Sequence, residues 1–340
     1  LGVDIFFVIS GFVITRSLLR RQGSASTWTG LAAFYIRRIK RLLPMLALIV
    51  VTAIVLIRLV APWPEFINRT GITAMFGVSN IQLFLVNTDY FGENNNLNPL
   101  MHTWALGIEE QFYLIYPLLC FWAMRRPGGG RSLLTVIFGT VTVLSCLGFA
   151  LLFHTHQPAV YYLMPFRAWE LGIGCLLSLY VRALDSRTSL VVQTLAFLSI
   201  IVAFVVGYRS PVISSFLAVG GSAGLILAGA KESALNRLML TSPLQYLGRL
   251  SYSIYLWHWL IIGLAIWTVG VNWISIPAIV IATFGLASLS FHLLEEPARH
   301  RPWFSLPPLN LAAGLSIMIS VAALILIMKM VNVPQFTGNK

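Results

Sequence analysis

Apolar stretches of about 20 residues recur along the whole length of this 340-residue chain. As an α-helix, each stretch is long enough to cross a hydrocarbon core of about 30 Å. The strands of a membrane β-barrel would instead be short segments of alternating hydrophobicity, which the sequence lacks. The sequence therefore predicts an all-α fold, a polytopic transmembrane helical bundle with about ten crossings. The crossings are expected at residues 3–19, 44–60, 103–124, 132–153, 164–182, 189–207, 212–230, 248–270, 274–294 and 310–329.

The balance of charge supports a membrane protein. Only 10% of the residues are charged, whereas a soluble domain carries about 25%, so there are too few charges to cover a water-facing surface. The net charge of +12 comes from basic residues in short loops between apolar stretches, which is typical of cytoplasmic loops. The sequence has no basic–aromatic face of the kind that binds nucleic acid, so nucleic acid is excluded as a partner.

One apolar segment, residues 70–87, departs from the simple pattern because it contains Asn80, Gln82 and Asn87. If this segment crossed the membrane, Arg126 and the later basic loops would be placed outside. If it is re-entrant or interfacial, most basic residues lie on the cytoplasmic side, in agreement with the positive-inside rule. We therefore expect one re-entrant or interfacial helix here and an extracytoplasmic C-terminus.

The three cysteines, Cys120, Cys146 and Cys175, all fall inside apolar segments. They offer neither a disulfide framework nor a metal-ligand spacing. The sequence also lacks a phosphate-binding glycine loop and a nucleophile elbow. We therefore expect no metal and no bound cofactor.

A basic cluster precedes the second apolar stretch. Arg37, Arg38 and Arg41 stand at helical spacing and are expected to share one face. Planar guanidinium groups bind phosphate oxygens in pairs, so the cluster suits a nucleotide-carrying donor such as coenzyme A. The alternative is an ordinary cytoplasmic anchor or a contact with lipid headgroups.

Ionisable residues at membrane depth are candidates for function because burying them is costly. His102 and Glu109 stand seven apart, so we expect them to stack on one helix face, with Glu110 beside them. Adjacent carboxylates repel, which favours a proton or a cation at one of them. This group is a candidate for proton transfer or for holding a sugar hydroxyl, and the alternative is a structural ion pair to another helix.

Three other ionisable residues are expected near the outer ends of two helices. Arg167 and Glu170 stand three apart and can pair on one face. Asp4 is expected to pair with an arginine or to line a cavity. The alternative for all three is an ion pair that only holds helices together.

One face of a later helix is expected to carry Ser251, Tyr255 and His258. His258 lies about 15 Å into its predicted helix, and an imidazole at that depth can bind a substrate or relay a proton. The alternative is a core histidine whose hydrogen bonds are satisfied. Glu295 and Glu296 are expected to cap a helix or to form salt bridges with the inner loops.

Five short stretches follow one another in a characteristic order. They are residues 2–12 (GVDIFFVISGF), 35–44 (YIRRIKRLLP), 102–113 (HTWALGIEEQFY), 167–172 (RAWELG) and 247–258 (LGRLSYSIYLWH). Together they resemble the acyltransferase 3 family of bacterial membrane O-acyltransferases, over about residues 1–300.

The resemblance implies a multi-pass protein of the bacterial inner membrane that transfers an acyl group, often acetyl, from cytoplasmic acyl-CoA. The acceptor would be a hydroxyl of a cell-envelope glycan such as lipopolysaccharide O-antigen, peptidoglycan or exopolysaccharide. On this interpretation, the arginine cluster holds the donor phosphates. The candidates for catalysis are Glu109, Glu110 and His258. The candidates for the acceptor cavity are Asp4, His102, Arg167, Glu170 and Tyr255.

The proposed catalytic histidine of the family lies on a first helix, and this chain is expected to begin after that helix. Residues 1–300 would form the core without it, 301–330 an appended transmembrane helix, and 331–340 an extracytoplasmic tail or linker. Some family members continue into an SGNH-type outer domain. We expect this fragment to be inactive alone, since its general base is missing, and to expose a polar seam beside residues 3–19.

Two other functions are compatible with the sequence. A transporter of acyl groups or glycans would favour inverted repeats and paired broken helices, which we do not detect. A non-catalytic membrane anchor for an outer domain is the second alternative.

Overall fold

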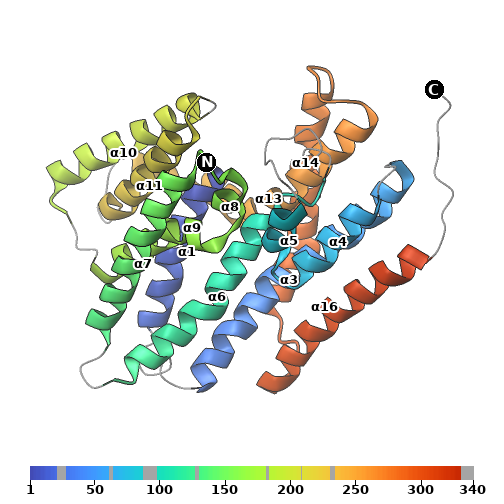
Figure 1. Ribbon diagram of the computed structural model, residues 1–340, viewed down its shortest axis with the longest axis horizontal. Helices are drawn as coiled ribbons and strands as arrows, with labels where there is room; N and C mark the ends of the chain where they lie inside the picture. Colours follow the sequence, from blue (N-terminus) through green and yellow to red (C-terminus); the bar gives the residue numbers. More distant parts are fainter. Residues whose placement is uncertain are drawn as a thin grey trace. The chain divides into compact units, whose positions relative to one another are not determined.

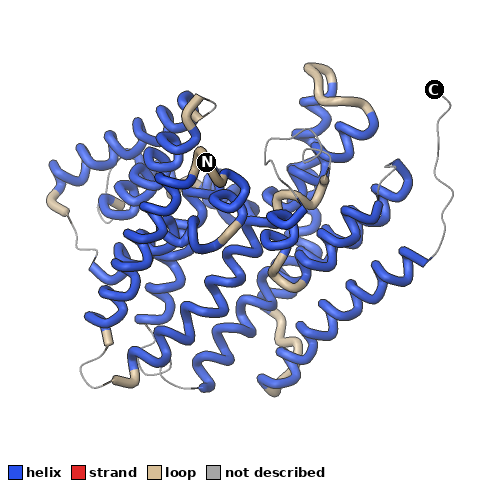
Figure 2. Tube along the Cα trace, viewed as in Figure 1, coloured by secondary structure: helices blue, strands red, loops and turns tan. Residues whose placement is uncertain are grey.

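The computed structural model describes residues 1–20, 28–60, 64–86, 98–126, 130–180, 184–207, 209–229 and 234–330 (Figure 1). These residues form helices joined by turns and loops, without a β-strand (Figure 2). The all-α prediction is therefore confirmed. The elements are α1 (Gly2–Leu19), α3 (Trp28–Val60), α4 (Pro64–Met75), α5 (Ser79–Val86), α6 (Thr103–Met124), α7 (Arg131–Leu152), α8 (Gln157–Tyr162), α9 (Met164–Tyr180), α10 (Ser186–Val206), α11 (Pro211–Ala228), α12 (Ala234–Met239), α13 (Ser242–Thr268), α14 (Ser275–Ser290), the π-helical η1 (Phe291–Glu295), α15 (Glu296–His300) and α16 (Pro307–Met330).

Eight helices of the described residues are long and apolar enough to cross a membrane. They support a multi-pass membrane protein, but the predicted count of about ten is not confirmed. The predicted crossings 103–124 and 164–182 are the helices α6 and α9, and neither belongs to the eight. Helix α9 has only 17 residues, and α6 carries two adjacent carboxylates.

The segment predicted to be re-entrant or interfacial forms two short helices rather than one. Helix α4 has 12 residues and α5 has 8, so neither reaches the roughly 20 residues that a crossing needs. The chain turns between them at Gly77, whose φ of +69° favours glycine. Asn87, the last polar residue of this prediction, lies outside the described residues.

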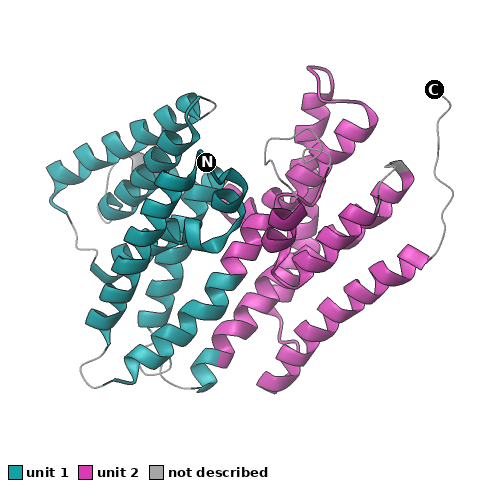
Figure 3. Cartoon of the chain, viewed as in Figure 1, with its two compact units in different colours: residues 1–31, 111–246 teal, residues 32–110, 247–340 magenta. Residues whose placement is uncertain are grey.

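The chain divides into two compact units (Figure 3). Unit 1 contains Leu1–Leu31 and Gln111–Tyr246, and unit 2 contains Ala32–Glu110 and Leu247–Lys340. Because the boundaries fall inside α3, α6 and α13, these three helices each contribute residues to both units.

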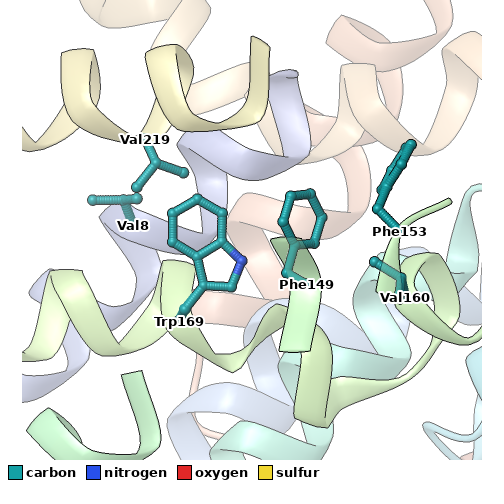
Figure 4. Close-up of a cluster of buried hydrophobic side chains, with 6 residues drawn as sticks. All are labelled: Val8, Phe149, Phe153, Val160, Trp169 and Val219. Carbon is teal, nitrogen blue, oxygen red and sulfur yellow. The ribbon is translucent and has the colours of Figure 1, made fainter. Parts of the chain in front are cut away.

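The core of unit 1 is built around Trp169 of α9. Its indole lies with Val8 and Val219 on one side and the Phe149 ring on the other, 5.5 Å away between ring centroids (Figure 4). Helices α1 and α9 approach so closely that there is no room for a side chain at the crossing. A Cβ on Gly174 would lie 2.1 Å from the Val8 carbonyl oxygen. Small residues at a crossing allow such backbone contact between membrane helices.

In unit 2, α16 packs along α3 and α4 instead of standing apart. A Cβ on Gly314 would lie 2.7 Å from a methyl group of Ile39. At the other end of α16, the Lys329 ammonium lies 3.0 Å from the Glu65 carboxylate of α4. The predicted division into core, appended helix and tail stays a prediction, and residues 331–340 lie outside the described residues.

The variant Gly174→Ala is expected to push α1 away from α9, because its Cβ would meet the Val8 backbone. Overpacking of this kind costs about 1–3 kcal/mol, so the midpoint of thermal unfolding in detergent should fall. The matched control is Gly220→Ala, where an added Cβ has no neighbour within 4 Å and the helix prefers alanine. Equal midpoints for the two variants would show that the crossing tolerates a side chain.

Candidate functional sites in the two units

Unit 1 encloses a group of three charged side chains. One guanidinium nitrogen of Arg167, Nη1, donates to Asp4 Oδ1 at 2.8 Å and to Glu170 Oε1 at 2.7 Å. Arg167 is 3% exposed, Asp4 4% and Glu170 0%. The predicted pairing of Arg167 with Glu170 and of Asp4 with an arginine is therefore what the structure shows. The Ser215 hydroxyl, which the sequence did not single out, donates to Asp4 Oδ1 at 3.4 Å.

Aromatic rings complete the surroundings of Arg167. Its guanidinium lies 5.2 Å from the centroid of the Phe149 ring and 5.0 Å from that of Tyr161, within the range of cation–π attraction. The second carboxylate oxygen of Glu170 is buried without a hydrogen-bond partner. This group ties α1 to α9, and it leaves one buried carboxylate oxygen free to accept a proton or a hydrogen bond.

The predicted open polar seam beside residues 3–19 is not found at three of its four expected residues. Asp4 is 4% exposed, Ser10 7% and Glu109 2%. The prediction of an exposed seam was wrong for these side chains, because all three are buried. Only His258, the fourth, is partly exposed.

In unit 2, a short turn holds His102 against α13. The Trp259 indole N–H donates to the Asn98 carbonyl oxygen at 2.9 Å, and the Asn98 side chain donates to the Thr70 hydroxyl at 3.0 Å. Gly263 leaves room for Pro99, which would lie 2.9 Å from an added Cβ. Helix α6 begins at Thr103, so His102 does not stack with Glu109 on one helix face, as predicted, but lies in the turn before it.

Three rings meet where this turn contacts α13. The centroid of the His102 ring lies 5.2 Å from that of Tyr255 and 5.8 Å from that of His258. The Tyr255 hydroxyl donates to the His102 carbonyl oxygen. Ser251, predicted on the same helix face, lies in α13 as well but is exposed.

The two carboxylates of α6 differ in burial and in neighbours. Glu109 is buried and faces the Arg38 guanidinium. Glu110 packs against Gly77, where a Cβ would lie 2.2 Å from a carboxylate oxygen. The turn between α4 and α5 therefore depends on glycine both for its backbone conformation and for the space that Glu110 occupies.

The three arginines of the predicted cluster differ in exposure. Arg37 is exposed, whereas Arg38 and Arg41 are half-buried. Arg38 faces Glu109, and its guanidinium lies 5.6 Å from the Phe34 ring centroid. Arg41 is among the charged groups that face Glu295.

Glu295 is a buried carboxylate that the sequence placed at a helix cap. It accepts a hydrogen bond from the Ser253 hydroxyl at 2.6 Å, and Ser253 was not singled out by the sequence. Glu295 ends the π-helical turn η1, and turns of this kind re-aim side chains and are frequent at functional sites. An acidic residue at the end of an apolar helix was the only sequence signal for it.

Two further features of the described residues bear on chemistry. No group of three or more His, Cys, Asp or Glu side chains in the described part could hold a metal ion. An apolar cavity of about 440 Å³ lies in unit 1 between α6, α7 and α9, lined by residues such as Tyr116, Phe138 and Phe166. None of the predicted site residues lines it.

The variant Arg167→Met should destabilise the protein strongly, since it leaves two buried carboxylates without their cation. Removing one partner of a buried ion pair costs about 3–5 kcal/mol. The triple variant Asp4→Asn, Arg167→Met, Glu170→Gln should regain most of this loss, because no buried charge remains. Thermal unfolding in detergent measures both. If the triple variant unfolds at the same midpoint as Arg167→Met, the unpaired charges are not the cause of the lost stability.

Comparison with known proteins identifies the family. A family model described as an acyltransferase domain matches residues 1–295. The peptidoglycan O-acetyltransferase OatA of Listeria monocytogenes is 33% identical, over 88% of this chain and 51% of that protein. The putative peptidoglycan O-acetyltransferase YrhL of Bacillus subtilis is 32% identical, over 88% and 50%. The O-acetyltransferase OatA of Staphylococcus aureus is 31% identical, over 88% and 53%.

The chain thus spans about half the length of the curated relatives it matches. No solved structure matches it. The family model covers far more than half of the chain and includes both groups of buried charges described above. The chain belongs to the acyltransferase 3 family.

Proposed function

We propose that this protein is an integral membrane O-acyltransferase that transfers an acetyl group from acetyl-CoA to a hydroxyl of a cell-envelope glycan. The observation that carries the proposal is a set of buried and half-buried polar residues in unit 2, all within the family match. It comprises Arg38 and Arg41, the α6 carboxylates, and the histidines His102 and His258. A group-transfer enzyme needs both an anion-binding site for its donor and groups that move a proton.

The donor site is proposed at Arg38 and Arg41. Both guanidinium groups are half-buried on the inward side of α3, where an incoming phosphate would compete with Glu109 and Glu295 for them. Arg37 is exposed and suits a contact at the rim of the site or with lipid headgroups.

The acceptor is proposed to be peptidoglycan, because two of the relatives are described as acting on it. Lipopolysaccharide has no such support. Glu109, Glu110 and His258 remain the candidates for catalysis. The remaining candidates would line the acceptor cavity: Asp4, His102, Arg167, Glu170 and Tyr255.

The location is proposed from the charge pattern. Basic loops on the cytoplasmic side would place the C-terminus outside the cytoplasmic membrane of a bacterium. An SGNH-type outer domain that follows residue 340 likewise stays a prediction.

The variant Arg41→Glu should weaken coenzyme A binding to the chain in nanodiscs by at least about tenfold, or 1.4 kcal/mol. Arg41→Lys should also weaken it, because an ammonium cannot replace a two-pronged guanidinium contact. The matched control is Arg237→Glu, a charge reversal at an exposed arginine of unit 1. If folded Arg41→Glu protein binds coenzyme A as the wild type does, the cluster is an anchor and not a donor site.

The topology is tested at Arg126, which lies at the end of α6. In a chain whose three cysteines are replaced by alanine, Arg126→Cys should resist a membrane-impermeant thiol reagent added to intact cells. It should react once the cells are opened. Labelling of Arg126→Cys in intact cells would reverse the proposed orientation.

A further inference from the structure

The apolar cavity of unit 1 lies between α6, α7 and α9 (Figure 1) and has a volume of about 440 Å³. Of the described residues that line it, none carries a charge, and most are aliphatic or aromatic. Its size is typical of a small-molecule site. Its walls therefore select an apolar ligand, and the cavity does not overlap with the groups of buried charges described above.

The two hydroxyl groups among these lining residues are already bonded within the protein. The Tyr116 hydroxyl shares a hydrogen bond with the Thr15 hydroxyl of α1. The Ser145 hydroxyl accepts from the Trp169 backbone N–H at 3.0 Å. A sugar or a phosphate would lose its contacts with water here and gain few in return, which is costly. The walls thus favour a hydrocarbon chain over a glycan or a nucleotide.

The cavity has a buried floor and an exposed mouth. Tyr116 and Phe138 form the floor, with 4.8 Å between their ring centroids, and both are buried. At the mouth, Ile115, Val141 and Leu144 are exposed. A chain can therefore enter between these three side chains from the surface of unit 1.

The depth of the mouth indicates which molecule meets it. Helix α7 (Arg131–Leu152) is one of the helices long and apolar enough to cross a membrane. Val141 lies near its middle, about 15 Å from either end at 1.5 Å per residue. At that depth a bilayer of about 30 Å offers acyl chains and not headgroups or water.

Contacts on both faces of α9 oppose closure of the cavity. The hydrogen bond of Ser145 to Trp169 joins α7 to α9. Next to it, a Cβ on Gly172 would lie 2.1 Å from the Thr142 hydroxyl oxygen, so the two helices already touch. On the other face, Arg167 ties α9 to α1. An apolar cavity of fixed walls excludes water and takes up apolar molecules, which supply the missing dispersion contacts.

We propose that this cavity binds one acyl chain of a membrane phospholipid. The chain enters past the three exposed side chains of the mouth and packs against the rings of the floor. It contacts α9 at Ala168 and Gly172, whereas Arg167 binds Asp4 of α1. The bound lipid therefore supports the helix that carries the buried ion group. This inference does not depend on acyl transfer by the protein.

The site is tested by photolabelling. The chain is reconstituted in nanodiscs that contain phosphatidylglycerol with a diazirine in the middle of one acyl chain, and mass spectrometry locates the label after irradiation. We expect label on Tyr116 and Phe138, which lipid on the outer surface cannot reach because both are buried. Label confined to exposed residues such as Leu151 and Leu190 would indicate surrounding lipid only and would overturn the site.

The variant Ala168→Leu tests the same site by filling it. The larger side chain displaces about two methylene groups of the lipid, so label on Tyr116 and Phe138 should fall at least about tenfold. Added phosphatidylglycerol should also raise the midpoint of thermal unfolding in detergent less than for the wild type, because lipid bound to the folded state stabilises it. The matched control is Ala312→Leu, at an exposed alanine of α16, which should match the wild type in both measurements.

Folded Ala168→Leu protein with wild-type labelling of the floor would overturn the proposal. If this variant does not fold, Leu144→Trp takes its place, because an indole at this exposed position narrows the mouth without disturbing the core. It should likewise reduce the label on Tyr116 and Phe138, and unchanged label there would also contradict entry of the chain through this mouth.

Discussion

A guanidinium enclosed by helices must find its counter-charges inside the protein, because neither lipid nor a packed core can solvate it. Arg167 satisfies this requirement with two carboxylates on one nitrogen, one from its own helix and one from α1. The requirement fixes how α1 lies on α9. The glycine at position 174 then follows, since the two backbones can come this close only where a side chain is missing.

The same constraint explains the arrangement of unit 2. A turn of irregular backbone carries polar groups that a helix would satisfy internally, so its partners must come from neighbouring side chains. The Asn98 side chain accepts from the Leu100 N–H, and the Trp259 indole donates to the Asn98 carbonyl oxygen; the same turn brings His102 to α13. The His102 ring itself is buried without a hydrogen bond that meets ideal geometry.

Periodicity and length were enough to predict the helices and the local pair of Arg167 and Glu170, because both depend only on neighbours along the chain. They could not show that Asp4 joins this pair, since that contact spans 163 residues. They predicted the helix start at residue 103, where α6 begins, but not that the turn before it brings the His102 ring against α13. The sequence also could not predict which face of α13 is buried. In the structure Ser253 is buried and donates to Glu295, whereas Ser251 is exposed, and this rotation depends on packing against other helices.

The arginine cluster shows how the structure separates residues that one motif groups together. Spacing alone put Arg37, Arg38 and Arg41 on a single face, so the motif had to be either an anchor or a donor site. In the structure the residues separate: Arg37 is exposed, whereas Arg38 and Arg41 are half-buried and face carboxylates. An exposed guanidinium gains little from a fixed partner, whereas a half-buried one needs an anion. A donor phosphate that displaced Glu109 or Glu295 would still give each half-buried guanidinium an anionic partner. Before the donor binds, the buried carboxylates would fill that role and keep the site ordered.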